Sequence, residues 1–228
     1  AIRRQRQMCI RDRNENTLTY QTNIKKKHFL NVLGGITFQN SDYEIYSFRT
    51  THIPNESLGM AGMSEGQAGT TTSAKSSWAM LSYLGRVTYN YMSKYYATAS
   101  FRADGSSKFS PNHRWGYFPA GAFAWRLSDE PFMENTKNWL DNLKVRLSYG
   151  LSGADNIDSN LWKETWTSST VSFNGITYSG YKPNGMLSNP DLKWETTTSR
   201  NLGIDFGFMG NRLAGSIDVY WNTTKDLL

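Results

Sequence analysis

The stretch LSYLGRVTYNY, residues 81–91, decides the fold class of this protein. Its odd positions carry apolar or aromatic side chains or glycine, and its even positions are polar except for Leu84. Successive side chains of a β-strand point to opposite faces, so this alternation predicts a strand with one apolar and one polar face. Ten strand residues at ~3.3 Å each, tilted by about 40°, rise ~25 Å, which is the height of the apolar band of a membrane β-barrel.

The same alternation recurs along the rest of the chain. LKVRLSYGL at 143–151 and LAGSIDVYW at 213–221 repeat it clearly. Weaker versions of the pattern cover five further segments: 15–24, 28–39, 95–103, 116–127 and 194–207. About eight long antiparallel strands follow from these segments. The predicted fold is all-β: a segment of an up-and-down transmembrane β-barrel, present here as one open, curved sheet.

The predicted connections alternate between long and short. Long loops are expected at about 40–77, 104–115 and 152–193, and the Gly- and Ser-rich part of the first is expected to be mobile. Short turns are expected at 25–27, 92–94 and 208–212, with one or two helical turns at 128–142. Strict alternation places all the long loops on one side, which is the arrangement of an outer-membrane barrel and not of a Greek-key sandwich.

The first thirteen residues, AIRRQRQMCIRDR, differ from everything that follows. MCIRDR at 8–13 looks like translated adaptor read-through, so we interpret 1–13 as non-native and 14–228 as a partial barrel domain; a basic periplasmic turn is the alternative. Without five Arg and one Asp the formal charge falls from +6 to +2, so nucleic-acid binding is not predicted. No signal peptide is visible, and we expect a fragment without either natural end.

Composition leaves two classes open. Hydrophobic residues make up 38% and aromatic residues 14% of the chain, which is too aromatic for a disordered protein. Such a chain is either a membrane barrel with aromatic girdles or a soluble, secreted all-β module that binds glycans. No apolar run approaches the ~18 residues of a transmembrane helix, so a helical membrane protein is excluded.

Residues for catalysis or metal binding are sparse. His28, His52 and His113 lie in unrelated segments, and Cys9 falls in the suspect first residues. Asp155 shares a polar loop with other carboxylates, which usually indicates solvated groups. There is no calcium loop and no phosphate-binding glycine loop. We therefore expect no enzyme activity, no metal and no cofactor.

Two sets of residues are candidates for function. Seven strand charges are predicted to line a lumen, where they would touch a plug or substrate or merely hydrate the wall: Arg86, Arg102, Arg126, Lys144, Arg146, Asp205 and Asp218. Five aromatic residues of the 152–193 loop are candidate ligand contacts, unless they pack the loop on itself or on a partner: Trp162, Trp166, Phe173, Tyr178 and Tyr181. Aromatic faces stack on sugar C–H surfaces, so this mixture with Ser, Thr and Asn suits a glycan.

Several segments, in this order, resemble SusC/RagA-type TonB-linked outer-membrane proteins of the Bacteroidetes. They are FRADGSSKFSPNHRWGYF (101–118), AWRLSDEPFM (124–133), LKVRLSYGLSG (143–153), NPDLKWE (189–195), NLGIDF (201–206) and DVYWNTTKDL (218–227). The resemblance covers residues 14–228 and corresponds to the C-terminal half of the family's barrel.

The resemblance implies a 22-stranded barrel in the outer membrane, with an N-terminal plug that is not part of this sequence. It further implies a SusD-like lipoprotein at the outer mouth and the TonB complex, acting through the plug, as partners. The implied cargo is an oligosaccharide or peptide, and the implied surroundings are outer-membrane lipid, with no nucleic acid.

Overall fold

The computed structural model describes the backbone of residues 2–185 and 187–228, and the side chains from residue 7 on apart from 56 and 186. By its internal contacts the chain divides into two compact units. The larger unit comprises residues 15–38 and 80–228, and the smaller one comprises residues 1–14 and 39–79. Among the described residues, no helix is long and apolar enough to cross a membrane.

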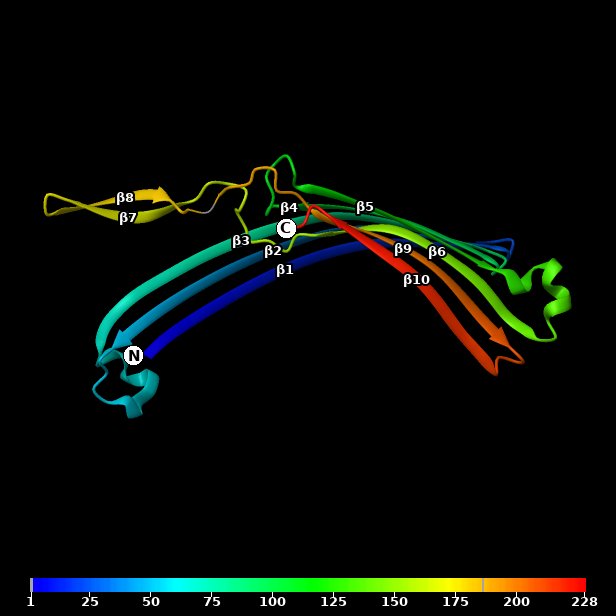
Figure 1. Cartoon of the computed structure of the whole chain (residues 1–228), viewed down its shortest axis with the longest axis horizontal. Coiled ribbons are helices and arrows are strands. Elements are labelled where there is room, and N and C mark those ends of the chain that lie inside the picture. The colour runs from blue at the N-terminus through cyan, green and yellow to red at the C-terminus, as the bar shows by residue number, and fades with distance from the viewer. Residues whose placement is uncertain (1, 186) are drawn as a thin grey trace. The chain divides into compact units, whose positions relative to one another are not determined.

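The larger unit holds an eight-stranded sheet whose neighbours follow chain order, β1-β2-β3-β4-β5-β6-β9-β10 (Figure 1). Its strands are β1 (Ile2–Ile24), β2 (His28–Thr51), β3 (Gln67–Tyr91), β4 (Tyr95–Ser106), β5 (Trp115–Arg126), β6 (Leu140–Ala154), β9 (Glu195–Phe208) and β10 (Leu213–Lys225). Of the first three strands, only the parts nearest the short turns belong to this unit. The sheet is open, with β1 and β10 at its edges, and confirms the predicted up-and-down, all-β class.

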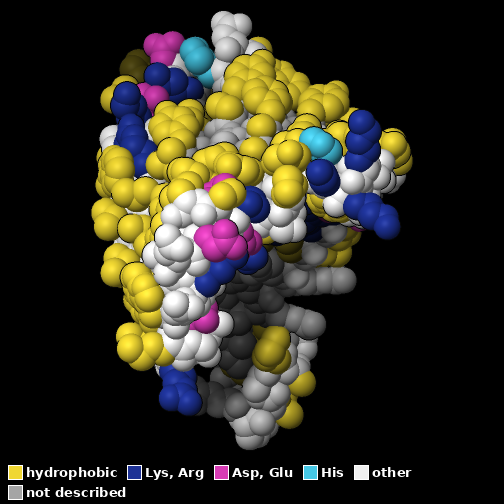
Figure 2. Space-filling view, turned by 90° about the vertical axis from the view of Figure 1, so that its right-hand side faces the viewer, with side chains coloured by type: hydrophobic (Ala, Val, Ile, Leu, Met, Phe, Trp, Pro, Cys, Tyr) yellow, Lys and Arg dark blue, Asp and Glu magenta, His cyan; other side chains and the backbone are white. Residues whose placement is uncertain are grey.

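The register gives this sheet two chemically different faces. Directly paired residues of antiparallel strands share a face, and Tyr83 pairs with Ala103, which pairs with Tyr117. The face that contains them is apolar and its large side chains are exposed: Tyr83, Val87, Phe101, Tyr117, Phe123, Leu147, Ile204 and Val219. Figure 2 shows hydrophobic side chains gathered over one side of the molecule and charged and other polar groups over another.

Aromatic side chains form two rows across the apolar face. Near the short turns, Tyr95 stacks on Tyr91 at 6.2 Å and on Trp125 at 6.0 Å between ring centroids. Near the long connections, Trp115 stacks on Tyr83 at 6.0 Å. Trp115 and Trp125 stand at the two ends of β5, and ten tilted strand residues rise ~25 Å. The two rows are thus separated by about the thickness of an apolar membrane band.

The short connections are as expected. Residues 25–27 and 92–94 are three-residue turns, with Lys25, Lys26 and Met92 at φ values of 52°, 56° and 52°. Between β5 and β6 the chain forms two 3-10 turns, η2 (Leu127–Asp129) and η3 (Pro131–Thr136), which confirms the predicted helical turns.

The long connections are shorter than predicted. Within the smaller unit, β2 continues to Thr51 and β3 begins at Gln67, so the expected loop at 40–77 shrinks to 52–66, which contains η1 (Glu56–Ser64). In the outer end of β2 the large apolar residues do not keep to alternate positions, because Tyr43 and Ile45 share one face and Tyr46 and Phe48 share the other. The outer end of β3 consists mostly of small and polar residues, so neither end shows a clear period of two. Likewise, Gly105 pairs with Trp115 inside the sheet, so the loop predicted at 104–115 spans only 107–114.

The loop predicted at 152–193 contains a structure that the sequence reasoning missed. Residues Trp166–Phe173 (β7) and Ile176–Pro183 (β8) form a separate two-stranded antiparallel hairpin. Its turn is Asn174-Gly175, with φ values of 50° and 77°. An Asn-Gly pair between two strand-like runs is a strong hairpin signal, because both residues tolerate positive φ.

The smaller unit contains the outer parts of β1, β2 and β3. Lys75 forms an ion pair with Glu44 at 2.7 Å, and this hydrogen bond lowers the pKa of Glu44 and raises the pKa of Lys75. The guanidinium of Arg11 lies 5.7 Å from the ring centroid of Trp78. Strand β1 runs through residues 2–13, whereas residue 1 lies outside the described residues; the non-native origin of 1–13 stays a prediction.

Candidate functional site

The polar face of the sheet carries a charge cluster centred on Arg146 of β6. Its Nε and Nη2 donate to both carboxylate oxygens of Asp205 in β9, at 2.8 to 3.1 Å. Nη2 also donates to Asp218 of β10 at 3.0 Å, and Asn201 donates to the same carboxylate at 3.3 Å. One guanidinium therefore joins three neighbouring strands. Its hydrogen bonds to Asp205 are bidentate and charge-assisted, which makes them stronger than hydrogen bonds between neutral groups.

The register places all seven predicted charges on this polar face, opposite the apolar one. Lys144 pairs directly with Asp205 across β6 and β9, and its ammonium lies 5.2 Å from the ring centroid of Tyr96. Arg102 contacts Asp104 at 2.7 Å and Ser82 at 3.2 Å.

The two remaining cations stand apart from the Arg146 cluster. Arg126 lies 3.5 Å from Asp129 in the adjoining short connection. Arg86 pairs with Ser100 in the register between β3 and β4. The seven charges are thus divided among separate local pairings, and only Lys144, Arg146, Asp205 and Asp218 are brought together.

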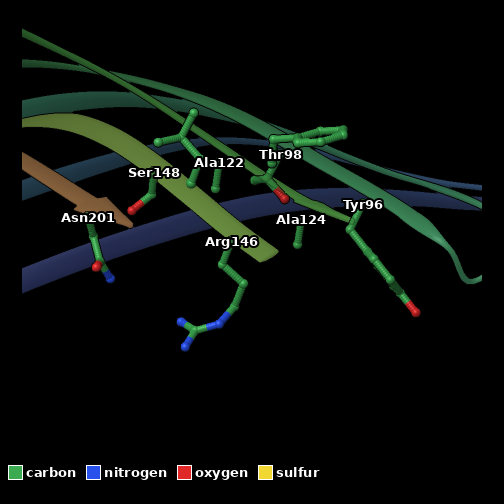
Figure 3. Close-up of a pocket in the computed structure, with 9 residues that line it drawn as sticks. Tyr96, Thr98, Ala122, Ala124, Arg146, Ser148 and Asn201 are labelled. Carbon is green, nitrogen blue, oxygen red and sulfur yellow. The ribbon is translucent and has the colours of Figure 1, made fainter. Parts of the chain in front are cut away.

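A depression lies on the polar face beside Arg146 (Figure 3). Its floor is the alanine run of β5, and its volume is about 300 Å³. The lining comes from four neighbouring strands: Tyr96, Thr98, Ala122, Phe123, Ala124, Arg146, Leu147, Ser148 and Asn201. A second depression of about 250 Å³ continues along the same floor and shares Thr98, Ala122 and Ser148 with the first.

At the long-connection end, three aromatic residues form a small buried core that sequence reasoning missed. Phe109, Phe118 and Trp194 are 0%, 7% and 7% exposed, and the ring of Trp194 lies 5.2 Å from Phe109 and 5.5 Å from Phe118. The indole Nε1 of Trp194 donates to the carbonyl of Arg114 at 2.8 Å. We call these three residues the loop core, because Phe109 and Trp194 belong to different connections.

Two glycines and one ion pair complete the loop core. A Cβ on Gly153 or Gly116 would overlap the ring of Phe118, so a larger residue at either position would force that ring to shift. Asp155 accepts a hydrogen bond from Ser106 at 3.1 Å and lies 3.6 Å from the ammonium of Lys108. Asp155 is therefore a structural anchor and not the solvated carboxylate that its polar loop suggested.

The five predicted loop aromatics do not converge on one site. Trp166 and Tyr181 lie on one face of the β7–β8 hairpin, and Phe173 and Tyr178 lie on the other. All four are more than half exposed, up to 79% for Tyr181. Trp162 precedes the hairpin, is half-buried, and has the ammonium of Lys163 at 5.1 Å from its ring centroid.

At the short-turn end, Glu130 connects two strands and a turn. It accepts a hydrogen bond from the indole of Trp125 at 3.1 Å and lies 3.8 Å from the ammonium of Lys94. Hydrogen bonds from the Tyr95 hydroxyl and the Trp125 indole hold the pKa of Glu130 below its usual value. This anchor fixes the aromatic row near the short turns to the η2–η3 connection.

Among the described residues, no three His, Cys, Asp or Glu side chains approach closely enough to hold a metal ion. Two of the histidines make separate contacts instead. His28 lies 2.7 Å from the hydroxyl of Tyr89, and His113 lies 3.2 Å from the hydroxyl of Ser110.

Long strands in up-and-down order, a two-faced open sheet, and long and short connections in alternation are the features of a membrane β-barrel wall. The model of the family "TonB dependent receptor-like, beta-barrel" matches residues 4–228, so the chain belongs to that family. This family membership also places the chain in the outer membrane.

The individual relatives are much longer than this chain. It is 36% identical over 217 residues to TonB-dependent receptor P26 of Formosa agariphila, covering 94% of this chain and 22% of the relative. It is 39% identical over 154 residues to TonB-dependent receptor SusC of Bacteroides thetaiotaomicron, covering 65% of this chain and 15% of SusC. A chain in the structure of the RagAB peptide transporter superposes with a TM-score of 0.87 and 26% identity, over 99% of this chain and 25% of that one.

Proposed function

We propose that this chain forms part of the wall of an outer-membrane importer of oligosaccharides or peptides. The observation that carries the proposal is the two-faced sheet, whose apolar face bears aromatic rows about one membrane thickness apart. Lipid covers that face, and the opposite, charged face lines the lumen. Cargo crosses without any bond being made or broken, so the wall needs no catalytic residue.

In this proposal the polar-face charges have two tasks. The cluster of Arg146, Asp205 and Asp218 keeps the lumen wall hydrated and ties β6, β9 and β10 together.

The exposed aromatics of the β7–β8 hairpin stand at the long-connection end, where cargo arrives, and offer stacking surfaces.

The proposed partners are the TonB complex and a SusD-like surface lipoprotein. Similarity to receptors named TonB-dependent and to SusC supports this choice. TonB acts on an N-terminal plug held inside the barrel, while the wall strands supply the lumen surface. The lipoprotein meets the long connections.

The alternative is a soluble, secreted glycan-binding module. A soluble all-β domain buries its apolar side chains between two packed sheets. Here the apolar face is exposed, with Tyr117 at 59% and Leu147 at 56% exposure. An apolar surface of this kind needs a cover, and lipid supplies it for an importer.

Fractionation and growth test the proposal together. The full-length gene product that carries this chain is expected in the detergent-extracted outer membrane. Its deletion is expected to abolish growth when one oligosaccharide or peptide mixture is the sole nutrient, and complementation restores growth. Recovery of the protein in the periplasmic or secreted fraction would favour the soluble module and refute the importer.

A further inference from the structure

The apolar face changes its chemistry along β6, β9 and β10, three strands that lie side by side (Figure 1). Directly paired residues share a face, so the register gives each row of side chains across the three strands. Toward the short turns the rows are apolar apart from one glycine: Leu143, Phe206 and Gly215, then Val145, Ile204 and Ile217, then Leu147, Leu202 and Val219. Three further rows follow toward the long connections: Tyr149, Arg200 and Trp221, then Leu151, Thr198 and Thr223, then Gly153, Thr196 and Lys225. The face therefore passes from apolar, through aromatic, to hydroxyl-bearing and cationic.

Arg200 stands where these strands leave the apolar band. Near the short turns, Trp139 stacks on Phe208 at 5.9 Å between ring centroids and continues the aromatic row there. Arg200 and Phe208 lie on the same strand, β9, eight residues apart. Eight residues correspond to ~26 Å of strand, and to a rise of ~20 Å at the ~40° tilt of barrel strands. Because a long charged side chain bends toward the nearer polar boundary, its guanidinium reaches the headgroup region on the long-connection side.

Aromatic rings flank the guanidinium of Arg200. Its central carbon lies 5.8 Å from the ring centroid of Tyr149, and Trp221 is its direct partner in β10. These two ring types are stable at a membrane boundary because each has an apolar body and a polar group. Nη1 of Arg200 donates to the hydroxyl of Thr223 at 3.4 Å, and most of its five N–H groups have no acceptor among the described residues.

No carboxylate neutralises the two cations of this face. Neither Arg200 nor Lys225 forms an ion pair within the part of the chain that the structure describes, whereas Arg146 on the polar face has two carboxylate partners. Asp226 follows Lys225 in sequence, but it pairs with Lys193 at 3.0 Å. The six rows contain no Asp or Glu, and the same face of β3, β4 and β5 carries no charge at its paired positions. The positive charge of this face is thus concentrated at one place on β9 and β10.

An anion from the surrounding lipid is the natural partner for this charge. A cation that faces hydrocarbon is costly, and the cost falls where headgroups begin. A guanidinium binds a phosphate group through two parallel hydrogen bonds, and an ammonium adds a point charge. Basic groups next to an apolar surface are a common way to bind a phosphorylated lipid.

We infer that Arg200 and Lys225 form a docking site for the phosphate group of an outer-leaflet lipid. Thr198 and Thr223 lie in the row between the two cations and offer hydroxyl contacts, and the acyl chains lie along the apolar rows toward the short turns. Free phosphate would meet the same cations but would have no acyl chains to cover the apolar rows. This inference rests on the proposed function, which places lipid on this face and the long connections outside the cell.

The test is a lipid titration of the purified full-length gene product in neutral detergent, with native mass spectrometry measuring the fraction of protein that carries lipid. The probes are monophosphorylated lipid A, fully dephosphorylated lipid A and, as a competitor, inorganic phosphate. The monophosphorylated form is expected to bind at least about tenfold more tightly than the dephosphorylated form. Inorganic phosphate at the same concentration is expected to leave the bound lipid in place.

Two double variants locate the site. Arg200→Gln with Lys225→Gln is expected to remove the tenfold preference for the phosphorylated lipid, while the affinity for the dephosphorylated lipid stays the same. That unchanged affinity, together with heat-modified electrophoretic migration, checks that the variant barrel is folded. Lys25→Gln with Lys26→Gln is the matched control, because it removes two positive charges from a turn at the other end of the sheet. The control is expected to keep the full preference.

Three outcomes overturn the docking site: the two lipids bind equally, the Arg200 and Lys225 variant keeps the full preference, or inorganic phosphate displaces the lipid at equal concentration. The last result would mean a site for the free ion and not for a lipid. All three leave the importer intact, because its tests are membrane location and growth. Recovery of the protein in a soluble fraction would instead remove the importer, and the lipid-facing surface with it.

Discussion

The loop core and the β7–β8 hairpin are both rich in aromatic residues, and both belong to the long-connection end. The loop core buries its aromatic rings, whereas the hairpin exposes them. Trp194 is 7% exposed and donates its indole N–H to a carbonyl, whereas Trp166 is 59% exposed. An isolated two-stranded hairpin is marginal in water, because its rings have no second layer to cover them. The comparison teaches that burial, and not aromatic content, distinguishes rings that stabilise the fold from rings that are accessible to another molecule.

The largest expected effect comes from emptying the loop core. Trp194→Ala removes a buried ring and a hydrogen bond, and is expected to cost about 3–5 kcal/mol of unfolding free energy. The loss of unfolding free energy is measured by denaturant unfolding of the full-length protein, with protease cleavage in the 155–194 connection as the readout. Trp166→Ala is the matched control and should change stability by less than about 0.5 kcal/mol. If Trp194→Ala and Trp166→Ala lowered the unfolding free energy equally, the loop core would be no more important for stability than the hairpin.

A smaller effect is expected from overfilling the same core. Gly153→Ala places a methyl group against the ring of Phe118, and the strain is expected to cost about 1–3 kcal/mol. Gly180→Ala on the hairpin meets open space and serves as the control. Adding Phe118→Leu to Gly153→Ala should recover part of the loss in the same unfolding assay; no recovery would place the strain elsewhere.

Removing the charge of Asp155 beside the loop core is expected to cost about as much unfolding free energy as Gly153→Ala, or less. Asp155→Asn weakens the contacts with Ser106 and Lys108, for an expected cost of about 1–2 kcal/mol. Asp158 is exposed in the same loop, and Asp158→Asn should have no measurable effect. If the two substitutions had the same effect on the unfolding midpoint, Asp155 would be an ordinary solvated carboxylate.

The smallest effect on stability is expected for a substitution in the hairpin, which is expected to change ligand binding instead. Tyr181→Ser should change the unfolding free energy by less than about 0.5 kcal/mol, because the ring is 79% exposed. If the hairpin offers stacking surfaces to an oligosaccharide cargo, the same substitution weakens calorimetric binding of a neutral hexasaccharide to the purified full-length gene product. A marked loss of stability would mean that the ring is packed after all.

Period two made most of the sheet predictable. Wherever a strand has one apolar face, as in 81–91 and 143–151, both the strand and the side of its charges follow from the sequence. The outer ends of β2 and β3 could not be found in this way, because their apolar residues are either absent or divided between the two faces. The hairpin was missed although Asn174-Gly175 signals it.

The candidate site was predictable only in part. Placing Arg146, Asp205 and Asp218 on one face required only alternation, but their mutual contact depends on a register that spans 59 and 72 residues of sequence. The depression depends on alanines that carry no chemical signal of their own. The loop core joins Phe109 and Trp194 from separate connections, and a contact between residues so distant in sequence cannot be predicted from a local pattern.

The open ends of the sheet determine how this chain behaves when it is made alone. Strands β1 and β10 are the two edges of the eight-stranded sheet, and within the described residues neither has a partner on its outer side. Unpaired main-chain groups along a long edge act as a template for any other strand. Recombinant production of the isolated polypeptide therefore favours edge-to-edge stacking of copies, and covering β1 and β10 with donor strands is the route to a monodisperse sample.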